Sequence, residues 1–161
     1  MDTLMHTEVK KKKAPALARQ ALSFFLHSLL ALASWIALML LGYAVNPVGI
    51  SQWVILLLSL AVPLVVGLVV ARLHPGEMAT AVWLVGFIWA MIVALYVLDQ
   101  PTGPGHCFQC TATEKLSRTF FSLPNPSGLI DDDGPFIGTW PSAALVGYSI
   151  GAWLGMRRRG A

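Results

Sequence analysis

ALSFFLHSLLALASWIALMLLGYAV, residues Ala21–Val45, is a run of 25 residues without a single charged side chain. As an α-helix this run would be about 37 Å long, which exceeds the ~30 Å hydrocarbon core of a bilayer. A basic segment precedes it, as in a secretory signal peptide, but the apolar region of a signal peptide is only about 7–15 residues long. The stretch therefore predicts an uncleaved first membrane helix.

Three further apolar runs follow along the chain, at residues 53–72, 78–98 and 140–156. The first two are separated from their neighbours by short turn sequences, Asn46–Gly49 and Arg72–Glu77, which are rich in Pro, Gly and polar residues. The last run is short for a membrane span. Thr139 and Pro141 favour a helix start there, because Thr caps a first turn and Pro is tolerated within it.

The predicted fold is therefore an all-α integral membrane protein: a four-transmembrane-helix bundle with one long loop, residues 99–139, between the third and fourth helices. Composition agrees, because 56% of the 161 residues are hydrophobic and only 12% are charged. A soluble domain carries roughly a quarter charged residues. The pI near 9 would suit a nucleic-acid partner. However, the basic residues flank the apolar runs, as in membrane proteins, so we predict the lipid bilayer as the partner and no nucleic acid.

The basic residues predict the orientation. Nine of the 11 Lys and Arg residues lie in segments that would share a side with the N-terminus: Lys10–Lys13, Arg19, Arg72 and Arg157–Arg159. The other two, Lys115 and Arg118, lie in the long loop. By the positive-inside rule, the tails 1–20 and 157–161 are cytoplasmic, residues 21–156 form the membrane domain, and the loop 99–139 is extracytoplasmic. The predicted location is a bacterial inner (plasma) membrane.

Small residues recur at four-residue spacing in the last two runs. The fourth run carries Ala143, Gly147, Gly151 and Gly155, and the third carries Gly86, Ala90 and Ala94. Such spacing places small residues on one side of a helix, where they allow two backbones to approach closely in lipid. We predict that the third and fourth helices pack together through these stripes. Docking of another subunit on the glycine face is the alternative.

His27 is the one ionisable residue well inside an apolar run. Intramembrane ionisable groups often mark function. We predict that His27 forms a hydrogen bond with a serine on a neighbouring helix, and a proton-transfer or cofactor role is the alternative.

The long loop contains both cysteines, in His106-Cys107-Phe108-Gln109-Cys110. In an oxidising compartment the pair predicts a structural disulfide. A second interpretation is thiol–disulfide exchange by Cys107 and Cys110, with His106 stabilising a thiolate. A third is a metal site, but zinc needs four ligands and the loop offers three, so we predict no metal within the chain.

The redox interpretation is similar to one known arrangement. Four membrane helices with an outward-facing CxxC resemble the quinone-linked thiol oxidases of membranes. Those enzymes also use a second cysteine pair, and this chain has only two cysteines. The resemblance is thus limited to the helix count and one motif, and no family is assigned from it.

Thr111 and Glu114 have the spacing of a helix capping box. Beyond them, Leu116, Phe120 and Phe121 are interspersed with Lys115 and Arg118, which predicts a short amphipathic helix on the outer membrane surface or over the mouth of the bundle.

These features together predict a small polytopic protein that acts as a non-enzymatic accessory or assembly subunit, with other membrane subunits or copies of itself as partners. A thiol–disulfide oxidoreductase is the first alternative, and a small transporter or channel component is the second. We predict no cofactor.

Overall fold

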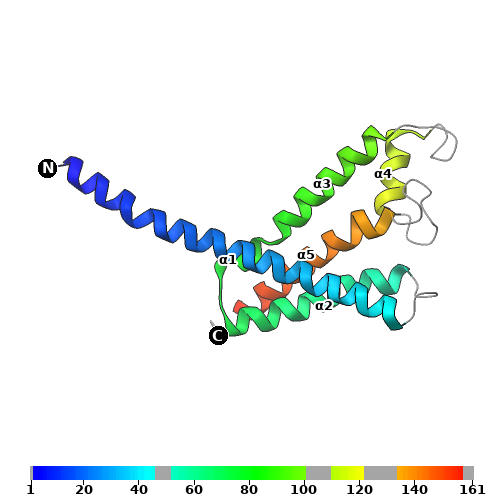
Figure 1. Ribbon diagram of the computed structural model, residues 1–161, viewed down its shortest axis with the longest axis horizontal. Helices are drawn as coiled ribbons and strands as arrows, with labels where there is room; N and C mark the ends of the chain where they lie inside the picture. The colour runs from blue at the N-terminus through cyan, green and yellow to red at the C-terminus, as the bar shows by residue number, and fades with distance from the viewer. Residues whose placement is uncertain (1, 46–51, 101–109, 122–133, 158–161) are drawn as a thin grey trace.

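The apolar runs form long helices, and all regular structure in the described part of the chain is helical (Figure 1). A computed structural model describes residues 2–45, 52–100, 110–121 and 134–157. Its elements are α1 Asp2–Val45, α2 Gln52–Leu73, the 3-10 helix η1 Glu77–Ala81, α3 Trp83–Asp99, α4 Ala112–Phe121 and α5 Gly134–Arg157.

Three helical segments are long and apolar enough to cross a membrane: Leu17–Leu41, Trp53–Leu73 and Met78–Asp99. Their outward faces are apolar as well. Leu57 on α2 is 63% exposed and Leu95 on α3 is 64% exposed, which suits contact with lipid rather than water. The chain therefore has the construction of a multi-pass membrane protein. The predicted helical class is confirmed, and a fourth crossing by α5 stays a prediction.

The first helix is longer than its apolar run. Residues 1–20 were predicted as a tail, yet α1 begins at Asp2. The Lys, Ala, Leu and Gln residues of this segment are good helix formers, so the helix continues beyond the apolar run.

The third run is not one helix over 78–98. It divides into η1 and α3, with a break at Val82. The Trp83 backbone N–H donates to Ser149 Oγ on α5 at 2.7 Å, and the Val85 N–H donates to the Val82 carbonyl with 3-10 spacing. The α-helical ladder is interrupted because a donor is directed to another element.

The last helix begins six residues before the predicted residue 140, at Gly134. Pro141 therefore lies inside α5 rather than in its first turn, and Thr139 does not cap it. The proline in the first turn of α5 is Pro135, its second residue, where the backbone N–H has no helical partner to lose. The prediction overlooked this proline.

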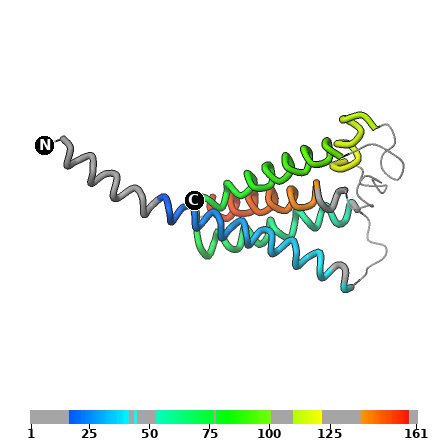
Figure 2. Tube along the Cα trace, turned by 45° about the horizontal axis from the view of Figure 1, so that its top comes forward, coloured from blue at the N-terminus to red at the C-terminus, as the bar shows by residue number. Residues whose placement is uncertain are grey.

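α5 lies between α2 and α3 and contacts both (Figures 1 and 2). α1 contacts α2, η1 and α5, while α4 lies against the C-terminal end of α3 and the N-terminal half of α5. One apolar cluster, which includes Ala31, Ala71, Val82 and Tyr148, lies where α1, α2, η1 and α5 meet. α5 is therefore the element on which the other helices are assembled.

Candidate functional site

The glycine stripe of α5 lies against α2. A Cβ added to Gly147, Gly151 or Gly155 would meet the carbonyl oxygen of Leu60, Leu64 or Leu68, respectively. Both series advance by four residues in the same direction, so α2 and α5 run parallel. The prediction of α3 as the partner of these glycines is wrong, and the stripe is used inside the chain.

We predicted the wrong partner for the glycines of α5 because we missed a matching stripe of small residues on α2. Small or compact residues are buried along α2 at four-residue spacing: Ser59, Pro63, Gly67 and Ala71. A Cβ at Gly67 would meet the Tyr148 carbonyl, so close approach is reciprocal along this seam. The four-residue spacing of these residues is visible in the sequence of the second apolar run. It is more continuous there than the spacing of small residues in the third apolar run.

Gly86 of α3 contacts α5, as predicted for the third and fourth membrane helices. Its added Cβ would lie 3.1 Å from Leu145 Cβ and 3.3 Å from the Ser142 carbonyl oxygen, both on α5. Ser142 Oγ donates to the Gly86 carbonyl at 3.2 Å and to its own-helix Gly138 carbonyl at 3.0 Å. The other predicted packing residues, Ala90, Ala94 and Ala143, are half-buried. α3 thus packs on α5 at a different face from the glycine stripe.

His27 forms its hydrogen bond with a tyrosine, not a serine. His27 Nδ1 lies 2.7 Å from the Tyr148 hydroxyl, and both side chains are buried. The rings are tilted by 56° with centroids 5.9 Å apart. The bond joins α1 to the central helix α5. The prediction missed Tyr148 because a tyrosine in an apolar run resembles any other aromatic core residue.

The turn between α2 and η1 closes over the same histidine. A Cβ at Gly76 would lie 3.0 Å from Ser23 Oγ and 3.1 Å from His27 Nε2. His27 is therefore enclosed by α5 on one side and by this turn on the other.

Replacing Tyr148 with phenylalanine is expected to destabilise the bundle by about 1 kcal/mol, because interhelical hydrogen bonds in membranes average about 0.6 and reach about 1.7 kcal/mol. A double-mutant cycle with His27→Ala, measured by reversible unfolding in detergent, should give a coupling of similar size. Tyr96→Phe on the exposed face of α3 is the control. Strictly additive effects of the two substitutions would contradict the interaction.

Lys115 on α4 caps the end of α3. Its side chain is only 6% exposed, and Nζ donates to the Gln100 carbonyl at 2.5 Å and to the Leu98 carbonyl at 3.4 Å. These carbonyls lie at the C-terminal end of α3, where backbone acceptors lack helical partners and a cation is stabilised by the helix dipole. An ammonium group thus stabilises the end of one helix from another.

A second hydrogen bond to the end of a helix joins α5 to α4. The Thr139 hydroxyl donates to the Phe120 carbonyl at 2.5 Å, and the Phe120 ring would lie 3.1 Å from a Cβ at Gly138. α4 is therefore fixed at one end of the bundle by α3 and by α5.

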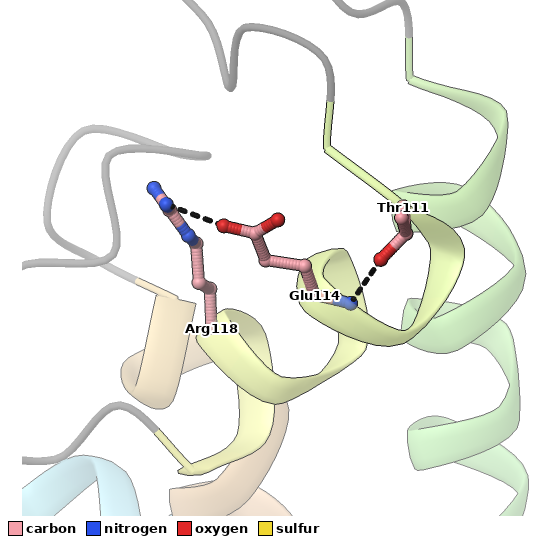
Figure 3. A network of polar contacts seen from close by, with 3 residues as sticks. All are labelled: Thr111, Glu114 and Arg118. Atoms are coloured by element: carbon pink, nitrogen blue, oxygen red, sulfur yellow. Dashed lines mark hydrogen bonds and ion pairs between the residues drawn. The ribbon is translucent and has the colours of Figure 1, made fainter.

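The predicted short helix is confirmed as α4, and Figure 3 shows its first turn. The Glu114 backbone N–H donates to Thr111 Oγ1 at 3.3 Å, as a cap requires. Glu114 does not complete the capping box, because its carboxylate pairs with Arg118 at 2.7 Å. Of the two predicted positions, the described contacts fit the one over the end of the bundle, because α4 packs on α3 and α5. On this helix Lys115 is buried, while Phe121 is 76% exposed.

Cys110 immediately precedes the cap residue of α4 and is half-buried. It packs with Phe120 against Val93 and Val97 of α3. His106 and Cys107 lie outside the described residues, so the disulfide, the redox pair and the metal site of the loop all stay predictions. The described residues include no group of three or more His, Cys, Asp or Glu side chains able to hold a metal ion.

No protein family matches the chain, and no curated protein or solved structure matches it either. The site is consequently interpreted from its own geometry.

Proposed function

We propose that the chain is a non-enzymatic accessory or assembly subunit of a complex in a bacterial inner membrane. In this proposal it has four membrane crossings, with α5 as the fourth and both termini in the cytoplasm. The 24 residues of α5 give a length of about 36 Å, sufficient for a crossing. The parallel course of α2 and α5 fits an even number of crossings, because both would then run from outside to inside.

The subunit role is supported mainly by one observation: the buried polar groups form hydrogen bonds between the helices of this chain. His27 and Tyr148 join α1 to α5, and Ser149 joins α5 to the start of α3. Lys115 and Thr139 fix α4 to its two neighbours. These groups hold helices at fixed positions, and the surface they leave outward is apolar. A rigid bundle with an apolar perimeter suits a protein that other membrane helices assemble on.

The test is isolation from native membranes. The tagged full chain should be crosslinked in intact cells, extracted in a mild detergent and analysed by mass spectrometry and native electrophoresis. We expect one further chain, or further copies of this chain, at fixed stoichiometry. Recovery only as a monomer, with no crosslinked species in intact cells, would contradict the subunit role.

Thiol–disulfide exchange by Cys107 and Cys110 is the second candidate. Cys110 lies two residues before Ala112, the first residue of α4, and helix N-termini favour the thiolate, which is the nucleophilic form. A Cys107→Ser, Cys110→Ser chain that folds and retains its partners but loses its cellular function would support this candidate. Retention of function would exclude it.

A further inference from the structure

Exposed basic residues gather at one end of the bundle, opposite α4. The α2–α5 contacts place Gly155 beside Leu68 and Ala71, so the two helices end at a similar level. Arg72 and Arg157 lie in their last turns. Arg19 lies on α1, two turns before His27 and one turn before Ser23, which contacts the turn following α2. Three helices therefore contribute an exposed arginine to the same end.

Arg157 is held in a particular way. Its guanidinium lies over the ring of Trp153, 5.0 Å from the centroid. A cation in this position is attracted to the face of the ring. A guanidinium carries five N–H donors and can bind a phosphate through two parallel hydrogen bonds. Trp153 is half-exposed, and an exposed Trp near the end of a membrane helix is typical of the headgroup level.

The two ends of the bundle differ in how their basic groups are used. At the α4 end, Arg118 is paired with Glu114, and Lys115 is directed to backbone carbonyls. Within the described residues, no carboxylate pairs with Arg19, Arg72 or Arg157. Their charge is available to a partner.

We propose that this end binds the headgroup phosphates of anionic phospholipids, with Arg157, held over Trp153, as the main contact and Arg72 and Arg19 adding charge. The position of the arginines, at the ends of apolar helices, favours lipid over a soluble anion, because a bilayer that covers the apolar faces brings its phosphates to this level. The inference rests on the membrane placement of α5 in the proposed function.

The test is native mass spectrometry of the full chain, purified in detergent and titrated with phosphatidylglycerol or phosphatidylcholine. We expect preferential phosphatidylglycerol binding that Arg157→Gln weakens about fivefold, the effect of one basic side chain near a membrane surface. Trp153→Leu should also weaken it, because the guanidinium loses its support. Arg118→Gln, at the opposite end, is the control and should bind as the unmodified chain does.

Equal binding of the two lipids, or unchanged binding by Arg157→Gln, would overturn the proposal. Displacement of the lipid by millimolar inorganic phosphate would also overturn it, since the site would then take a soluble anion. These outcomes are independent of crosslinking to other subunits, so failure of the lipid site is distinguishable from failure of the subunit role.

Discussion

Gly151→Leu is expected to prevent assembly of the bundle. A Cβ at this position would overlap the carbonyl oxygen of Leu64, and the carbonyl carbon would be only 2.8 Å away. The obstructing atoms are backbone, so no side-chain rotation relieves the overlap and the two helices must separate. Overpacking of a core typically costs about 1–3 kcal/mol and occasionally more. Separation of this seam also removes the close contacts of Gly147 and Gly155 with α2. Size-exclusion profile, thermal unfolding and protease resistance in detergent are the measurements.

The seam offers a graded series and a matched control. Gly155→Ala should be milder than Gly151→Ala, because the nearest atom to its Cβ, the Leu68 oxygen, lies at 2.7 Å. Val146→Leu enlarges an exposed side chain of the same helix and should leave stability unchanged. A Gly151→Leu chain with the stability of the Val146→Leu chain would contradict the parallel α2–α5 seam.

Lys115→Met is expected to destabilise the α4 end by about 1.5–3 kcal/mol, the range for hydrogen bonds to a charged group. The substitution keeps an unbranched apolar chain but removes the ammonium that caps the Leu98 and Gln100 carbonyls. Faster hydrogen exchange should appear in the last turn of α3 and in α4, with a lower unfolding temperature.

Arg118→Met is the control on the same helix. Its ion pair with Glu114 joins two side chains that are each more than two-fifths exposed, and such pairs contribute about 0.3–0.5 kcal/mol. If the two substitutions had the same small effect, the Lys115 cap would make no difference to stability.

The helices were predictable because lipid imposes a simple composition on the segments that face it. Runs such as Ala21–Val45 and 53–72 are identifiable from the absence of charge alone. The start of α4 was predictable for a local reason, since a cap at Thr111 requires only residues within one turn.

The pairing of helices was not predictable in this way. Gly147, Gly151 and Gly155 show that α5 has a face for close approach, but small residues occur on both α2 and α3. Whether the glycine face of α5 packs on α2 or on α3 depends on which helix has backbone carbonyls in register with the glycines over many residues. The charge pattern likewise marks Lys115 as polar, yet its burial depends on the end of α3 lying within reach of its amine.

The most direct test of the membrane architecture is the accessibility of single cysteines. In a chain carrying Cys107→Ser and Cys110→Ser, we would introduce His74→Cys, Ser117→Cys or Arg157→Cys, one at a time, each at an exposed position. The four-crossing architecture predicts that an impermeant thiol reagent labels Ser117→Cys in intact cells and labels the other two only after the membrane is opened. Labelling of all three from one side, or of Arg157→Cys together with Ser117→Cys, would contradict it.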